Sequence, residues 1–354
     1  MVLRSRSLSC LAAGLSLVVA CGGGDDDDFP DAAIDANTRI DAVPPPAGCD
    51  WAEGGEAHND TSAEDTQLAV GTSAVVICGD LAARAPDGDG LIDNDAYSIE
   101  IATEGEYLLR LTVDGDLGDA FLGLDILDTF GDYFGGGYFA AGHAVAAVYL
   151  PAGTFAIEAY AYGDAAPTTA IPYALSIAPD DRDARCGAPG APAFTETSDG
   201  AEHRGNDTIS VSFSPDYLTV LTASATDAPE DTGLTATSTD LTIAGSTANV
   251  GSDGDEYLDR DAYLVEVGPG ANQLDIRLAW SGDTADLDFL LFPVPDAGEP
   301  FDVGGGLEVS NEDDEFASIA VEPGSYWLWV GAYAGSGGLP KPYDVRICPS
   351  TFTP

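Results

Sequence analysis

Asp93-Asn94-Asp95-Ala96-Tyr97-Ser98-Ile99-Glu100-Ile101 is followed 166 positions later by Asp259-Arg260-Asp261-Ala262-Tyr263-Leu264-Val265-Glu266-Val267. In the first stretch, apolar and polar side chains alternate from Tyr97 to Ile101, which puts the apolar ones on one face of a β-strand. Similar alternating runs recur along the chain, and Asp-Gly or multi-Gly turn signals separate them at the spacing of a β-sandwich. No long helical period follows residue 20, so the sequence predicts an all-β fold.

The offset of 166 extends beyond these two stretches and reveals an internal repeat. Glu64-Asp65-Thr66 recurs as Glu230-Asp231-Thr232, and further on the offset drifts to about 170, where Pro172-Tyr173 matches Pro342-Tyr343. Two copies of one domain therefore fill most of the chain, and each is long enough to bury its own core. We predict two tandem antiparallel β-sandwiches, with an extra stretch in the second copy at about 197–229.

Further motifs support this division. They are Asn59-Asp60-Thr61 and Asn206-Asp207-Thr208 near the domain starts, the Asp-x-Asp-x-Tyr stretches above, Ala-Asp-Leu-Asp-Phe-Leu-Leu at 285–291, Gly-Ser-Tyr-x-Leu-x-Val at 324–330 and a last strand at 343–347. Together they resemble the bacterial pre-peptidase C-terminal domain family over nearly all of residues 55–348. The resemblance implies jelly-roll-like sandwiches that bind or position a ligand and do no chemistry. Residues 119–128 of the first copy depart from the Asp-Leu-Asp pattern.

The first twenty residues have the features of a bacterial signal peptide. Arg4 and Arg6 precede an uncharged run, Leu8 to Ala20, that is shorter than the roughly 20 residues a membrane-spanning helix needs. The run ends in Val18-Val19-Ala20-Cys21, which resembles the lipobox of bacterial lipoproteins, so Cys21 is the predicted lipidation residue. An ordinary signal peptide with a buried Cys21 is the alternative, but the Gly- and Asp-rich residues that follow favour a membrane tether.

We therefore expect an exported, membrane-anchored lipoprotein at the outer membrane or cell surface. The expected order along the chain is a signal peptide at 1–20, a lipidated disordered linker at 21–47, the first sandwich at 48–180, a second linker at 181–192 and the second sandwich at 193–354.

Charge restricts the partners of the protein. The chain has a formal net charge of −49, and loss of Arg4 and Arg6 with the signal peptide takes the mature chain to −51. Nucleic-acid binding needs clustered Lys and Arg, so that class is excluded. An anionic membrane surface would also repel the chain, so only the lipid can hold it there. The carboxylates either form an acidic surface suited to a salty medium or are organised around Ca²⁺.

Cysteine usage agrees with export. With Cys10 removed and Cys21 lipidated, four cysteines remain, and outside the cytosol they should form two disulfides. Cys49 and Cys186 occupy equivalent places at the two domain starts, so we predict one bridge within each copy, Cys49–Cys78 and Cys186–Cys348. His58, His143 and His203 lie near no Cys pair, and the sequence shows no zinc spacing.

Two acidic segments are candidate calcium sites. Carboxylates stand at positions 1, 3, 7 and 9 of each segment, and such a Gly-containing loop can converge on one hard cation. The candidate ligands are Asp87, Asp89, Asp93 and Asp95 in the first copy and Asp253, Asp255, Asp259 and Asp261 in the second. Weak Ca²⁺ binding, with a Kd of about 10⁻⁴ to 10⁻³ M, is the expectation. Ordinary turn chemistry is the alternative, because Asp and Gly also dominate exposed turns.

Aromatic residues form a second candidate site in the second copy. In the strand that begins at Tyr326, alternation places Trp327, Trp329 and Tyr333 on the face opposite to Leu328 and Val330. If that face were exposed, it would offer a stacking platform to an extracellular carbohydrate or protein. Cover by a loop or a neighbouring domain is the alternative.

These observations favour a non-catalytic protein. No Gly-x-Ser-x-Gly elbow is present, and no His stands in a context that suggests a catalytic triad. We expect a lipid-anchored protein whose two calcium-stabilised sandwiches bind an extracellular ligand. A structural spacer or surface-coat lipoprotein without a specific ligand is the alternative, and a hydrolase with a hidden carboxylate pair ranks third.

Overall fold

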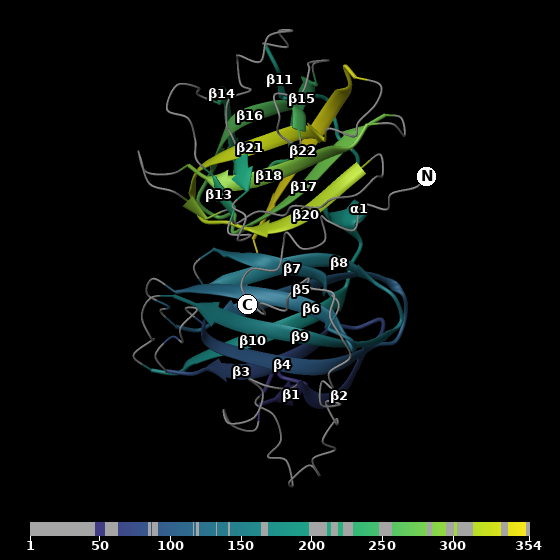
Figure 1. Ribbon diagram of the computed structural model, residues 1–354, viewed down its shortest axis with the longest axis vertical. Coiled ribbons are helices and arrows are strands. Elements are labelled where there is room, and N and C mark those ends of the chain that lie inside the picture. The colour runs from purple at the N-terminus through teal and green to yellow at the C-terminus, as the bar shows by residue number, and fades with distance from the viewer. Residues whose placement is uncertain are drawn as a thin grey trace, which may run out of the picture. The chain divides into compact units, whose positions relative to one another are not determined.

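The structure is a computed structural model in which the chain divides into two compact units, with the boundary between Asp180 and Asp181 (Figure 1). It describes residues 47–53, 63–83, 86, 91–115, 117, 120–131, 133–140, 142–163, 169–197, 211–213, 219–221, 229–247, 257–281, 285–294, 301–302, 314–333 and 339–351. The predicted signal peptide, Cys21 and the linker up to residue 46 lie outside the described residues.

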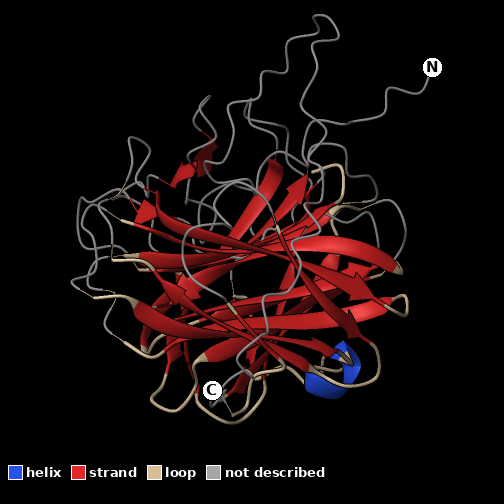
Figure 2. Ribbon diagram, turned by 90° about the horizontal axis from the view of Figure 1, so that it is seen from below, coloured by secondary structure: helices blue, strands red, loops and turns tan. Residues whose placement is uncertain are grey.

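The described chain is β-structure almost throughout, as the alternating pattern predicts (Figure 2). Its one described helix, α1 (Arg182–Arg185), is a single turn capped by the Asp181 side chain, which accepts a hydrogen bond from the Ala184 amide. Within the described residues, no helix is long and apolar enough to cross a membrane.

Ten strands build the first sandwich, in the hydrogen-bonded order β1-β3-β10-β5-β8-β7-β6-β9-β4-β2. Their bounds are β1 Trp51–Ala52, β2 Glu64–Val70, β3 Val75–Leu81, β4 Leu91–Ile101, β5 Gly105–Val113, β6 Phe121–Asp128, β7 Tyr133–Ala140, β8 His143–Leu150, β9 Gly153–Tyr162 and β10 Ile171–Pro179. One layer holds β1, β3, β10, β5 and β8, and the other holds β6, β9, β4 and β2. β7 connects the two layers by lying between β8 and β6.

The second sandwich has a five-stranded sheet, β11-β15-β22-β17-β20, and a four-stranded sheet, β14-β16-β21-β18. The bounds are β11 Phe194–Thr195, β14 Glu230–Ala236, β15 Leu241–Ser246, β16 Tyr257–Val267, β17 Gln273–Trp280, β18 Leu287–Pro293, β20 Asp314–Ala320, β21 Gly324–Tyr333 and β22 Pro342–Ser350. A small additional sheet contains β12 (Val211–Phe213), β13 (Thr219–Leu221) and β19 (Phe301–Asp302).

Every strand of the first sandwich except β7 has a described counterpart in the second, which confirms the repeat read from the sequence. Most neighbouring strands are antiparallel, as predicted, but β1 runs parallel to β3 and β2 runs parallel to β4. The pairs β11–β15 and β14–β16 repeat this exception. The reason is that the chain crosses to the other layer between the two members of each pair, so it returns in its original direction.

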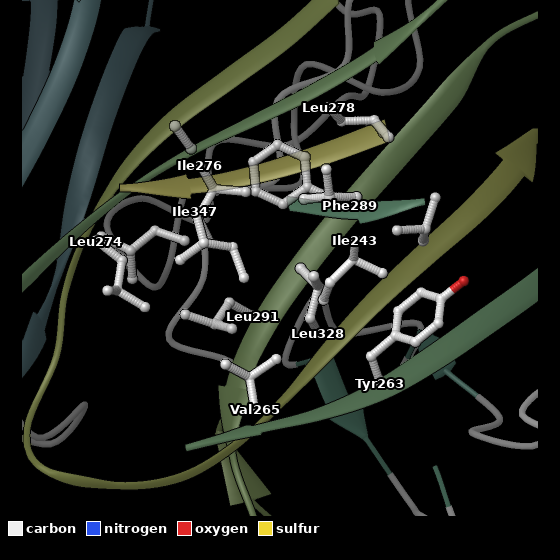
Figure 3. Close-up of a cluster of buried hydrophobic side chains, with 14 of the residues drawn as sticks. Ile243, Tyr263, Val265, Leu274, Ile276, Leu278, Phe289, Leu291, Leu328 and Ile347 are labelled. Carbon is white, nitrogen blue, oxygen red and sulfur yellow. The ribbon is translucent and has the colours of Figure 1, made fainter. Parts of the chain in front are cut away.

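The core of each sandwich lies between its two layers. In the second sandwich, Tyr263 and Val265 of β16, Leu328 of β21 and Ile276 of β17 are fully buried, and side chains from both sheets meet there (Figure 3). They come from every second position of their strands, which is the alternation seen in the sequence.

Both predicted disulfides are confirmed. Cys49 is bonded to Cys78 of β3, and Cys186 is bonded to Cys348 of β22. Each bridge joins a segment at the start of a domain to a strand of that domain's five-stranded layer.

Candidate metal centre

Among the described strands, two edge strands come together at one side of the second sandwich. β18 is the last strand of the four-stranded sheet and β20 is the last strand of the five-stranded sheet. Their counterparts in the first sandwich, β6 and β8, are connected through β7. Side chains at the β18 and β20 edges are therefore placed to link the two layers in a different way.

Three carboxylates converge at this edge. Asp286 and Asp288 come from the start of β18 and Glu315 comes from β20, and one oxygen of each lies within 4.8 Å of the other two. Asp288 and Glu315 are each only 1% exposed. Burial also raises the pKa of the half-buried Asp286 carboxyl above its usual range. We refer to these three residues as the acidic triad.

The triad has the donor chemistry and spacing of a calcium site. Ca²⁺ takes oxygen ligands at about 2.3–2.6 Å, so two oxygens bound to one ion lie no more than roughly 5 Å apart. The observed limit of 4.8 Å satisfies this condition. Three carboxylates would leave further coordination positions for other oxygens, because Ca²⁺ takes six to eight ligands.

The first sandwich lacks this triad. Strand register identifies the counterparts of the triad. In the first sandwich, Tyr160 of β9 lies between Asn94 and Gly123. In the second, Gly331 of β21 lies between Arg260 and Asp288, so Gly123 is the counterpart of Asp288. The same reasoning along the strands makes Phe121 the counterpart of Asp286 and Ala144 the counterpart of Glu315. The three carboxylates are thus a property of the second copy alone.

The acidic segments predicted from the sequence are positioned differently. Asp87, Asp89, Asp253 and Asp255 lie outside the described residues, and Asp259 lies in β16 with a side chain that is not described. The other three candidates, Asp93, Asp95 and Asp261, lie inside strands and are 2–3% exposed. The prediction of a continuous loop is wrong for this half of each segment, because β4 begins at Leu91 and β16 begins at Tyr257, before these aspartates.

Asp95 and Asp261 form matching buried networks. The Tyr173 hydroxyl donates to Asp95 Oδ2 at 2.7 Å and lies against the Tyr97 hydroxyl. In the second copy, Tyr343 donates to Asp261 Oδ2 at 2.5 Å, and its hydroxyl lies 2.6 Å from that of Tyr263. Burial raises the pKa of all four tyrosines.

A glycine in each copy makes room for these networks. A Cβ at Gly79 would lie 2.5 Å from the Tyr173 hydroxyl, and one at Gly245 would lie 2.4 Å from that of Tyr343. Asp93 also has an internal role, because its Oδ2 accepts a hydrogen bond from the Ala82 amide at 2.5 Å. These aspartates therefore contribute to the cores of the two sandwiches.

The predicted aromatic platform is wrong for Trp329, which is 0% exposed. The reason is the neighbouring Gly331, where a Cβ would fall 2.2 Å from the indole ring, so that the bare backbone leaves space for the ring. Trp327 is half-buried. Tyr333 lies in β21, but its side chain is not described.

The sequence contained only part of the signal for the triad. Asp286 and Asp288 belong to the Asp-Leu-Asp motif at 285–291, whose alternation places both side chains on one face. Glu315 stands 27 positions after Asp288 in a segment with several other acids, and no local pattern distinguishes it. The meeting of the two edge strands is a tertiary feature.

Comparison with known proteins gives only distant likenesses. No protein-family model and no curated protein matches the chain. Among solved structures, the chain is similar to the pre-peptidase C-terminal domain of a Bacillus anthracis collagenase, with 17% identity over 34% of this chain and 99% of that one, and a TM-score of 0.25. It is also similar to the CUB1-EGF-CUB2 region of human MASP-1/3, with 10% identity, 78% and 100% coverage and a TM-score of 0.18.

A third solved structure is the PBSX exported protein XepA, with 14% identity, 77% coverage of this chain, 86% of that one and a TM-score of 0.20. At these identities and TM-scores, the likenesses carry no argument about ligands or chemistry.

Proposed function

We propose that this protein is a non-catalytic, lipid-anchored lipoprotein of the bacterial cell surface, built from two domains of the pre-peptidase C-terminal type, whose second sandwich is stabilised by Ca²⁺. The observation that carries the proposal is the convergence of Asp286, Asp288 and Glu315 from the edges of two different sheets. An ion held there would link the two layers where β7 links them in the first sandwich.

The energetics favour a cation at this place. Burial of a carboxylate costs several kcal/mol unless a positive charge compensates it, and like charges at short range add to the cost. Asp288 and Glu315 are both buried, and the triad oxygens lie within 4.8 Å of one another. The first sandwich has Gly123 and Ala144 at the positions of Asp288 and Glu315, so this group of carboxylates is absent there.

A spacer or surface-coat role fits the described surface better than ligand binding. The predicted stacking platform loses its central residue, since Trp329 is fully buried. Two disulfide-bonded sandwiches on a long acidic tether would hold other parts of the cell envelope apart, and their negative charge would keep them soluble.

The test is calorimetric unfolding of the full-length chain with CaCl₂ and with NaCl at equal ionic strength. At a free Ca²⁺ concentration of about ten times Kd, one site adds about 1.4 kcal/mol, which raises the melting temperature by a few degrees. The shift should appear in the transition of the second sandwich. Equal shifts with CaCl₂ and NaCl would leave only charge screening and would refute the calcium site.

A variant pair makes this test specific. Asp288→Asn with Glu315→Gln should abolish the calcium-specific shift of the second sandwich, because it removes two of the three carboxylates of the triad. The matched control is Asp231→Asn with Glu322→Gln, which makes the same charge change at two exposed positions of the same sandwich. This control should keep the calcium response.

A further inference from the structure

The first sandwich contains a buried carboxyl pair that the triad does not involve. Asp125 of β6 and Glu158 of β9 are register partners on adjacent antiparallel strands, so their side chains lie side by side on one face of the sheet. Asp125 is 5% exposed and accepts a hydrogen bond from the Tyr160 hydroxyl. Asn94 of β4, on the other side of β9, is hydrogen-bonded to Glu158.

Two buried oxygens of this group could each accept a further hydrogen bond or bind a cation. Within the described part of the chain, Oδ1 of Asp125 and Oδ1 of Asn94 are both buried and accept no hydrogen bond. A buried acceptor without a donor destabilises the fold, so such atoms call for an explanation. A bound cation would supply the missing partner.

A glycine keeps space beside the Asp125 oxygen. A Cβ at Gly136 of β7 would lie 2.7 Å from Asp125 Oδ1 and 2.5 Å from the Tyr133 hydroxyl. No other residue could occupy position 136 without filling this space. Glu158 and Tyr160 of β9 lie beside Asp125, Tyr133 of β7 lies next to the same space, and Asn94 of β4 joins the group through its hydrogen bond to Glu158.

The pKa values of Asp125 and Glu158 are those of two buried carboxyl groups with no positive charge among their described neighbours to lower them. Burial, with a contribution from the Glu158 charge, raises the pKa of Asp125 to about 8, and burial raises the pKa of Glu158 as well. Asp125 therefore carries a proton at neutral pH, and that proton compensates part of the charge of the pair.

The second sandwich replaces the whole group. Strand register makes Leu290 the counterpart of Asp125, Trp329 the counterpart of Glu158 and Arg260 the counterpart of Asn94. Leu290 and Trp329 are 4% and 0% exposed, which shows that apolar residues fill this place well. Packing alone therefore gives no reason for two carboxyl groups in the first sandwich.

We propose that Asp125, Glu158 and Asn94 form a second site for a hard divalent cation such as Ca²⁺, with Asp125 Oδ1, Asn94 Oδ1 and the Glu158 carboxylate as protein ligands. A hydrolytic carboxyl pair is a poorer explanation, because a residue 5% exposed cannot reach a scissile bond in a substrate, whereas a bare ion needs far less room.

The experiment is Ca²⁺ titration of the full-length chain in an Asp288→Asn, Glu315→Gln background, which removes the triad and isolates the first sandwich. At one fixed pH, the background variant should bind Ca²⁺ saturably. Asp125→Asn and Glu158→Gln each remove one charged ligand and should each raise Kd by about tenfold or more. Glu100→Gln, an exposed change on β4, should leave Kd unchanged.

Two results would overturn the proposal. One is the absence of saturable Ca²⁺ binding in the background variant, and the other is an unchanged Kd in Asp125→Asn. Either result would leave Asp125 and Glu158 as a proton-sharing pair without a metal. Neither bears on the triad, whose test reads the unfolding of the second sandwich in the unmodified chain.

Discussion

At the residue scale, a few buried polar side chains determine how the stability of each sandwich depends on pH and on substitution. Asp125 has the clearest effect, because burial raises its pKa to about 8 in the folded chain, far above its usual value of 3.8. The folded state thus binds the proton more tightly than the unfolded state. The stability from this proton is fully present below about pH 4 and is lost as the pH rises through about 8.

With calcium chelated, the melting temperature of the first sandwich should therefore fall between pH 5 and pH 9. Asp125→Asn should flatten this dependence, since the amide remains neutral over the whole range. Calorimetry across the pH series measures both effects. A wild-type profile as flat as that of Asp125→Asn would contradict the raised pKa.

The buried tyrosine networks make a second prediction. Tyr173→Phe removes the hydroxyl that donates to Asp95 and lies against Tyr97, and so leaves buried polar groups with one partner fewer. The free energy of unfolding of the first sandwich should fall by about 1–3 kcal/mol. Tyr343→Phe should have the same effect on the second sandwich. Tyr149→Phe, at a 57% exposed position, is the control and should leave both transitions in place.

At the scale of elements, the repeat explains why so much of the fold could be predicted. In β4 and β16, the alternation of apolar and polar residues starts at Tyr97 and Tyr263. Such a period of two is a local pattern that can be read from a single sequence. The equivalent positions of Cys49 and Cys186 likewise led to the correct disulfides. The parallel pairs, such as β2 with β4, depend on crossing between layers, which no local pattern encodes.

The candidate sites were less predictable for the same reason. Asp125 and Glu158 become neighbours only through the pairing of β6 with β9, and Glu315 meets Asp288 only across two sheets. Trp329 had the alternation of an exposed residue, but Gly331 makes space for its ring. Burial of a face depends on the tertiary structure around it.

The two disulfides should differ in their contribution to stability. Their sequence separations are 29 for Cys49–Cys78 and 162 for Cys186–Cys348. The chain-entropy estimate is then about 3.5 and about 5 kcal/mol, because the longer loop restricts the unfolded chain more. Cys186→Ser with Cys348→Ser should lower the melting temperature of its sandwich more than Cys49→Ser with Cys78→Ser lowers that of the first. The reverse order in calorimetry would show that native-state effects outweigh loop length.

At the scale of the whole molecule, charge and attachment are connected. With the proposed cleavage after Ala20, the chain would carry a net charge of −51 and would not be attracted to an anionic leaflet, so a covalent lipid is the means of attachment that the sequence suggests. An ionic association would weaken in high salt, whereas attachment through acyl chains at Cys21 would not. Cys21→Ala should therefore leave the protein either unprocessed, with its signal peptide attached, or processed and free in the periplasm. Membrane fractionation combined with mass spectrometry of the N-terminus distinguishes these states, and a high-salt wash of the wild-type membranes serves as the control. If processed Cys21→Ala still sediments with membranes after that wash, another part of the chain holds it there, and the acidic sandwiches themselves must contact the envelope.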